Sequence, residues 1–107
     1  MTQLIQIQTT TATRDDATRI ADFLLLHQLA ACVQISGPIT SHYVWQDNRE
    51  QSSEWLCIIK TRDALYREVE QAIRSQHPYQ EPQIVALPII HAATGYAQWV
   101  VDNTGRE

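Results

Sequence analysis

The order of two hydrophobic repeats constrains the fold of this 107-residue chain more than any other feature. Residues 3–9 alternate between apolar and polar side chains, with Ile5 and Ile7 on one side, which is typical of a half-buried strand. Residues 14–29 then carry apolar side chains three and four positions apart, which predicts an amphipathic helix that Thr13 is placed to cap. Its expected apolar face consists of Ala17, Ile20, Ala21, Leu24 and Leu25.

Residues 31–61 predict a long β-hairpin. Gly37-Pro38 interrupts its first strand, where a proline indicates a bend or bulge. Asp47-Asn48 is expected to form the turn, because both side chains tolerate positive φ. The return strand ends in EWLCIIK, a nearly continuous apolar run that predicts a central strand covered on both faces. The hairpin is too long for the strands with which it has to pair, so its tip is expected to protrude.

A second helix follows the hairpin. Thr61 and Asp63 are expected to cap this helix, and its apolar face consists of Leu65, Val69, Ala72 and Ile73. The helix is expected to end near Gln76, because Pro78 disfavours the α conformation in the residue before it.

The remaining segments complete a β-α-β-β-α-β order with a short helix at its end. Residues 83–90 predict the fourth strand, Thr94 is placed to cap the last helix, and the polar tail from Asp102 is expected to fray. This order predicts one domain of the α+β class over residues 1–107. The arrangement is the ferredoxin-like split βαβ, in which helices cover one face of an antiparallel sheet.

The composition excludes several classes of partner. A net charge of −4 disfavours nucleic acid and an anionic membrane surface as partners, since both attract basic proteins. No apolar run approaches the roughly 20 residues of a membrane span, and no signal peptide is recognisable, so the chain is expected to be cytoplasmic. Cys32 and Cys57 lie in apolar segments and are expected to be free thiols, a disulfide being the alternative.

The common catalytic and metal motifs are absent from the sequence. It contains no glycine-rich phosphate loop, no G-x-S-x-G and no local zinc motif, and the four histidines are scattered. No nucleophile–base pair is visible either, so the chain is not expected to be an enzyme. Any metal site has to be assembled in three dimensions or between chains.

The HPYQEP motif after the second helix has two interpretations. It is either a joint, in which the prolines end a helix and start a strand while Tyr79 packs inward, or part of a ligand-binding cleft lined by His77, Tyr79 and Glu81. Lys60, at the end of an apolar strand, is either solvated or a cationic group that points into the same cleft.

The aromatic residues of the hairpin suggest an assembly. Tyr43 and Trp45 lie near its tip, and a protruding strand edge of this kind tends to pair with another chain. Trp45 and Trp55 are either packing anchors or platforms for a ligand. The hairpin is therefore interpreted as an arm for oligomerisation.

Five motifs in order carry a resemblance that covers the chain from about Ile5 to Val101: LAACVQI, SHYVWQDNREQ, IIKT, HPYQEPQIVALPI and YAQWV. They resemble the CutA family of divalent-cation tolerance proteins. The resemblance implies a ferredoxin-like, PII-like architecture and a homotrimer in which hairpin strands of neighbouring chains pair. It places Tyr43, Trp45 and Trp55 at the trimer interface, and it makes an intersubunit cleft the candidate ligand site, with Trp45, Lys60, His77, Tyr79 and Glu81.

The resemblance also implies a link to divalent metals, above all copper. One pattern in the family uses a cysteine of the first strand and two adjacent histidines, and the matching positions here are Thr9, Gln76 and His77. Because His77 alone keeps its type, the expectation is weak metal binding with no required cofactor. Two functions follow: a trimeric regulator that binds a metal ion or a small ligand at the cleft, or a stable trimeric scaffold that anchors another protein.

Overall fold

The computed structural model describes residues 2–105 and confirms the predicted order of elements. Four strands form one sheet in the order β2-β3-β1-β4, and every neighbouring pair is antiparallel. This is the strand order of the split βαβ fold. The elements are β1 (Leu4–Thr11), α1 (Arg14–Leu26), β2 (Cys32–Trp45), β3 (Asn48–Arg62), the 3₁₀ turn η1 (Asp63–Leu65), α2 (Tyr66–Gln76), β4 (Val85–Ile89) and α3 (Thr94–Asp102).

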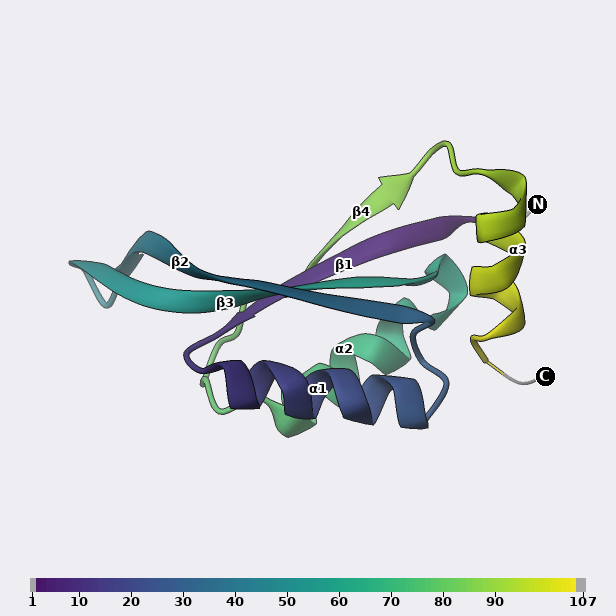
Figure 1. Cartoon of the computed structure of the whole chain (residues 1–107). Coiled ribbons are helices and arrows are strands. Elements are labelled where there is room, and N and C mark those ends of the chain that lie inside the picture. Colours follow the sequence, from purple (N-terminus) through teal and green to yellow (C-terminus); the bar gives the residue numbers. More distant parts are fainter. Residues whose placement is uncertain (1, 106–107) are drawn as a thin grey trace.

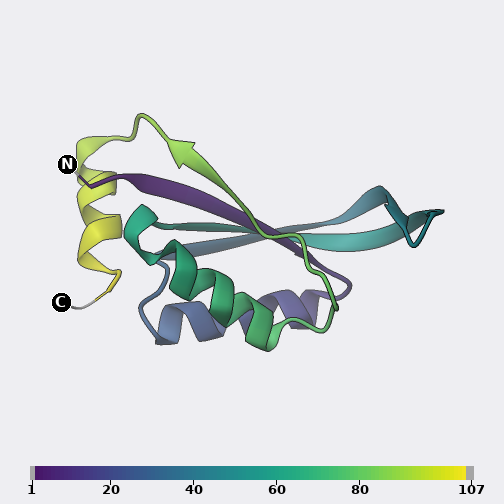
Figure 2. The same cartoon turned by 180° about the vertical axis from the view of Figure 1, so that it is seen from behind.

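Two helices cover one face of the sheet, and the other face is open. Helices α1 and α2 lie side by side beneath the strands, whereas α3 packs at the end of the sheet opposite the hairpin tip (Figures 1 and 2). The core between helices and sheet is aliphatic, and its completely buried members include Ile7, Leu24, Ile59, Val69 and Ile73. The hairpin of β2 and β3 extends beyond both helices, which gives the chain its long dimension of 44 Å.

The prediction that the return strand is covered on both faces is wrong within one chain. Strand β3 alternates: Cys57, Ile59 and Thr61 are buried against the helices, while Ile58 and Lys60 on the opposite face are half-buried. The continuous apolar run therefore presents apolar side chains on the open face of the sheet.

The hairpin has the expected bulge and a turn one residue earlier than predicted. A register shift between Ser36 and Ile39 confirms the bend at Gly37-Pro38. The turn residues are Gln46 and Asp47, with φ of 50° and 67°, so Asn48 is already paired in β3. Two central residues with positive φ match the right-handed twist of the strands.

Three of the predicted capping residues, Thr61, Asp63 and Thr94, do not cap a helix. Asp63 is the first residue of η1, and the N-cap position of α2 is Leu65, without a side-chain hydrogen bond. Thr61 belongs to β3, and its buried hydroxyl donates to the carbonyl oxygen of Leu29 over 2.7 Å. Thr94 is the first residue of α3, and the N-cap position belongs to Ala93 without a side-chain hydrogen bond. In contrast, the Thr13 cap is confirmed, because its hydroxyl oxygen accepts a backbone N–H of α1 over 3.1 Å.

The end of α1 and the polar tail also differ from expectation. Helix α1 ends at Leu26, and Leu25, placed in the apolar face by its spacing, is exposed. The tail is anchored as far as it is described: Thr104 is buried and accepts a hydrogen bond from Arg62 Nε over 3.1 Å, and the Gly105 N–H donates to a carbonyl oxygen over 2.7 Å. The predicted fraying is therefore wrong up to this point, and residues 106–107 lie outside the described residues.

One buried hydroxyl has no partner among the described residues. Thr9 is completely buried in β1, and its Oγ1 makes no hydrogen bond. We expect Thr9→Val to raise the free energy of unfolding by about 1 kcal/mol, because valine has nearly the same shape and removes an unsatisfied polar group. Urea unfolding at fixed protein concentration measures the change.

Thr61→Val is the matched control for this substitution. Thr61 is equally buried on the neighbouring strand, but its hydroxyl does have an acceptor. Removing this hydroxyl leaves a carbonyl oxygen without its donor, so stability should fall by about 1 kcal/mol. Equal destabilisation by the two substitutions would contradict the role assigned to the orphan hydroxyl.

Candidate functional site

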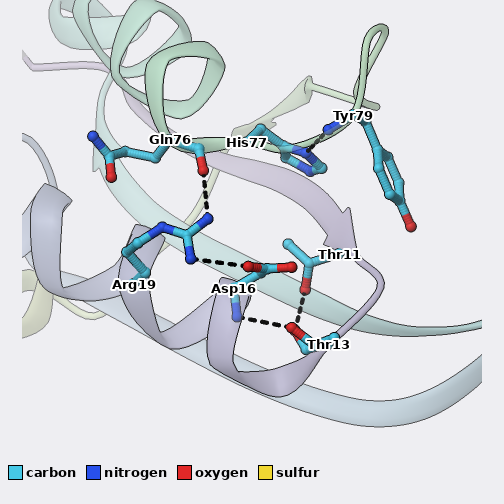
Figure 3. A network of polar contacts seen from close by, with 7 residues as sticks. All are labelled: Thr11, Thr13, Asp16, Arg19, Gln76, His77 and Tyr79. Carbon is cyan, nitrogen blue, oxygen red and sulfur yellow. Dashed lines mark hydrogen bonds and ion pairs between the residues drawn. The ribbon is translucent and has the colours of Figure 1, made fainter.

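The loop after α2 is pinned to β1 by a buried histidine. His77, the C-cap of α2, has an extended backbone, as expected before a proline. Its Nε2 donates to the carbonyl oxygen of Thr10 over 2.7 Å. Its Nδ1 accepts the backbone N–H of Tyr79 over 3.1 Å, as Figure 3 shows. A carbonyl oxygen can only accept and an N–H can only donate, so the ring carries its proton on Nε2. His77 therefore ties the end of α2 to β1.

A second network ties the same loop to α1. Arg19 Nη1 pairs with Asp16 over 2.9 Å, and Nη2 donates to the carbonyl oxygen of Gln76 over 2.7 Å (Figure 3). The last carbonyls of a helix lack intrahelical donors, and a guanidinium group supplies one here. The position of the loop is therefore fixed from two elements, α1 and β1.

The pinned loop places the hydroxyl of Tyr79 on a buried carboxyl group. Tyr79 Oη donates to Oε2 of Glu54 over 2.7 Å, and Glu54 is only 7% exposed. Burial first, and then the hydrogen bond to Glu54, raise the pKa of the Tyr79 phenol well above its ordinary value. Tyr79 is therefore a fixed neutral donor at physiological pH.

A groove of about 820 Å³ lies between this loop and the outer half of the hairpin. Its walls combine carboxyl groups with aromatic rings, and no lysine or arginine is among them. A concave site with a few converging polar groups is the usual form of a small-ligand site. The lining residues are Thr10, Ser41, His42, Tyr43, Val44, Trp45, Glu50, Glu54, Tyr79, Gln80, Glu81, Pro82 and Gln83.

The structure brings together some of the predicted site residues. Trp45, Tyr79 and Glu81 line the groove, and His77 lies behind it, where it holds Tyr79. Lys60 does not line the groove of its own chain, and its Nζ donates to Oε1 of a glutamine on β2 over 2.9 Å. Lys60 therefore does not reach this groove within one chain, and its place in an intersubunit cleft stays a prediction.

The three aromatic residues that the sequence analysis assigned to a trimer interface lie on two different surfaces of the chain. Tyr43 and Trp45 are exposed on the hairpin and also line the groove. Trp55 lies on the side of the sheet that faces the helices, where it packs against the core, and the Arg14 guanidinium group is 5.7 Å from its ring centroid. Gly37 is required beside it, because a Cβ on Gly37 would lie 2.9 Å from Cε3 of Trp55.

Glu54 and Glu50 are functional candidates that the sequence patterns did not indicate. Both glutamates precede the apolar run of the return strand. A glutamate at such a position is usually exposed to solvent at the end of a strand. Glu54 becomes recognisable only when Tyr79, 25 residues away, is placed against it. The sequence signal that could have indicated Glu54 is its position, a charged residue directly before an apolar strand.

The positions that match the family's metal ligands do not form a metal centre within one chain. Both ring nitrogens of His77 are engaged, Thr9 offers a neutral hydroxyl, and Gln76 offers a neutral amide. Copper prefers imidazole and sulfur donors, so this donor set suits it poorly. Within residues 2–105 there is no group of three or more His, Cys, Asp or Glu side chains that could hold a metal ion.

Both cysteines are free in the structure. Cys57 is buried in β3, and burial raises the pKa of its thiol to about 11. A buried thiol of this kind is mostly protonated at neutral pH and is a poor nucleophile and metal ligand. Cys57 therefore acts as a small core residue.

Comparison with known proteins agrees with this fold. The family model of the CutA1 divalent ion tolerance protein matches residues 5–103. The chain belongs to the CutA1 family. The divalent-cation tolerance protein CutA of Thermus thermophilus is 36% identical over 96 residues, which are 90% of this chain and 93% of that protein. The chain spans about half the length of its plant and vertebrate relatives, for example 55% of the Arabidopsis thaliana protein and 47% of the human one.

Solved CutA1 structures share the whole architecture. The protein from Ehrlichia chaffeensis superposes with a TM-score of 0.92 at 37% identity, covering 99% of both chains. The Oryza sativa protein gives a TM-score of 0.95 at 30% identity, covering 99% of this chain and 97% of that one. The ferredoxin-like prediction is thus confirmed. No helix within residues 2–105 has the length and apolar character that crossing a membrane requires.

Proposed function

We propose that this CutA1-family chain works as a homotrimeric regulator that binds a small ligand in the groove between the hairpin and loop 79–83. The observation that carries the proposal is the contact between Tyr79 and Glu54, which both line the groove. The neutral phenol of Tyr79 donates a hydrogen bond to the buried carboxyl group of Glu54. The pKa of the Tyr79 phenol is raised well above its ordinary value, and groups with strongly perturbed pKa values in a concave site cluster at functional sites.

The apolar surface supports assembly into a homotrimer. Val85 and Leu87 of β4 point to the open face of the sheet, since they pair with Gln8 and Gln6 of β1. A chain of this size gains from burying such a patch. The exposed large apolar side chains on this face, on the hairpin and around α3 are Tyr43, Val44, Trp45, Val85, Leu87, Ile90, Tyr96 and Trp99. Light scattering at low micromolar concentration should give three times the mass of one chain, and a monomer would overturn the proposal.

The ligand role of the groove is tested with Tyr79→Phe. A thermal-shift screen of small molecules on chelator-treated protein identifies compounds that stabilise the folded state. Tyr79→Phe removes the hydroxyl that holds the Glu54 carboxyl group in the groove wall and should weaken such a compound about tenfold. Tyr66→Phe, on α2 and outside the groove, is the control and should leave the affinity unchanged.

Divalent metal binding is a second candidate, favoured by the family to which the chain belongs. We propose that a metal such as copper binds weakly, with His77 as one ligand only if its bond to the Tyr79 N–H is given up. Titration calorimetry with copper tests this. Tight binding that survives His77→Gln would remove this site and direct attention to the other histidines and Cys57.

The alternative is a scaffold that acts through the stability of its trimer and has no ligand of its own. The same titrations separate the two, because a scaffold shows no saturable site while its trimer persists. We further propose that the chain is not an enzyme and is cytoplasmic, in keeping with its two free cysteines. Fractionation of cells that express the full protein tests the location, which varies among relatives: the Archaeoglobus fulgidus protein is described as periplasmic.

A further inference from the structure

Helix α3 is attached to the rest of the chain less firmly than α1 and α2. Of its nine residues, all of which the structure describes, only Val100 is buried, and Val100 does not belong to the core cluster between the helices and the sheet. The link before α3, residues 90–93, is exposed and belongs to no helix or strand. An element with so little buried apolar surface is expected to open at a lower free energy than the core beside it.

The two residues Thr104 and Gly105, which follow α3, fasten this helix to β3 and α1. Thr104 is 2% exposed, and its hydroxyl donates to the carbonyl oxygen of Val100 over 2.7 Å. Arg62, the last residue of β3, donates to Thr104 twice, from Nε to the hydroxyl oxygen and from Nη2 to the carbonyl oxygen, each over 3.1 Å. The Gly105 N–H donates over 2.7 Å to the carbonyl oxygen of Gln28, which directly follows the C-cap of α1.

The conformation of Gly105 makes the double contact between Arg62 and Thr104 possible. Gly105 has a φ of 69°, in the left-handed region that favours glycine. A Cβ at this position would collide with Nη2 of Arg62, the nitrogen that donates to the Thr104 carbonyl oxygen. Any larger side chain at position 105 would therefore displace the guanidinium group from that oxygen.

We propose that Thr104 and Gly105 form a latch, and that α3 opens as a separate unit when the latch is released. In the open form the hydrogen bonds to Arg62 and Gln28 are broken, while the sheet, α1 and α2 stay folded. Opening would expose Val100 and change where the aromatic rings of α3 lie at this end of the sheet (Figure 1). Neither latch residue lines the groove, so this inference does not depend on the proposed ligand.

Native-state hydrogen exchange of the assembled protein, in urea below its unfolding transition, tests whether α3 opens by itself. Ile73→Val weakens the core between α2 and the sheet, where Ile73 is completely buried. It should accelerate the exchange of peptides from β1 about fivefold. Peptides that span residues 94–102 should exchange at an unchanged rate, because the contacts of Ile73 persist when only α3 opens. Equal acceleration of both sets of peptides would show that α3 opens only with the whole chain, and would overturn the inference.

The same measurement on Gly105→Ala and Thr104→Val tests the latch. Each substitution should accelerate the exchange of residues 94–102 at least tenfold, the loss expected for a charge-assisted hydrogen bond. Gly95→Ala is the matched control, because Gly95 lies in the first turn of α3 and a Cβ there meets nothing within 4 Å. Alanine favours the helix, so exchange of residues 94–102 should be unchanged or slower in this variant.

Two results with these variants would overturn the latch. If Gly105→Ala and Thr104→Val leave the exchange of residues 94–102 unchanged, Val100 or a neighbouring chain holds α3 in place. If Gly95→Ala accelerates this exchange as much as Gly105→Ala does, any change near α3 loosens it, and the contacts of Arg62 have no special part. Light scattering on every variant ensures that the same assembly is compared throughout.

Discussion

Removal of the hairpin tip, residues 43–51, should convert the proposed trimer into single chains at low micromolar concentration. Strand β1 pairs with β3 only from Trp55 onward, so the outer parts of β2 and β3 pair with each other alone. No helix lies behind this part of the hairpin (Figure 1). An isolated two-stranded ribbon is marginal in water, so contacts with neighbouring chains should be what this ribbon contributes.

The design of the deletion keeps the rest of the hairpin. Ser41 pairs with Ser52, so an inserted Asn-Gly after His42 closes a three-residue loop of a common hairpin type. The control replaces only the turn residues Gln46 and Asp47 by Asn-Gly, which leaves the length of the arm unchanged. Light scattering should give one chain mass for the deletion and three for the control. A deletion variant that stays trimeric with an unchanged urea midpoint would contradict the role of the arm.

The elements of this fold were predictable because they depend on neighbours in sequence. The apolar stripe of α2, the bulge at Gly37-Pro38 and the Thr13 cap all follow from side chains within a few positions of one another. The cap assigned to Thr61 was wrong because its hydroxyl bonds to Leu29, 32 residues away. The acceptor of a buried hydroxyl group depends on which residues lie near it in the folded chain, and a local sequence pattern does not contain this information.

The site was only half predictable for the same reason. The HPYQEP motif indicated His77, Tyr79 and Glu81, but their contacts come from distant strands: Thr10 is 67 residues from His77, and Glu54 is 25 from Tyr79. Whether a glutamate of a strand faces solvent or a cleft depends on which other segment of the chain packs against that strand. The loop after α2 places Tyr79 on Glu54, so a residue at the start of the apolar run becomes part of the groove wall.

His77→Ala should have the second large effect, on stability and on the groove together. His77 is 8% exposed and makes two hydrogen bonds that join the loop to β1. Alanine leaves a cavity, a carbonyl oxygen of Thr10 without its donor and an N–H of Tyr79 without its acceptor. We expect the free energy of unfolding to fall by about 3 kcal/mol, the sum of a lost buried ring and two lost bonds.

Hydrogen exchange distinguishes positioning from simple destabilisation. His77 does not line the groove itself and acts through its hydrogen bonds to Thr10 and Tyr79, which do. Peptides that span residues 77–84 should therefore exchange faster in His77→Ala, while peptides from α1 keep their protection under native conditions. A compound that the thermal-shift screen identifies should bind at least tenfold more weakly, because the Tyr79 hydroxyl is no longer held on Glu54. His91→Ala removes an exposed histidine outside the groove and should change neither measurement. Uniformly faster exchange in every element would show that His77 contributes only global stability, since a positioning residue loosens its own loop first.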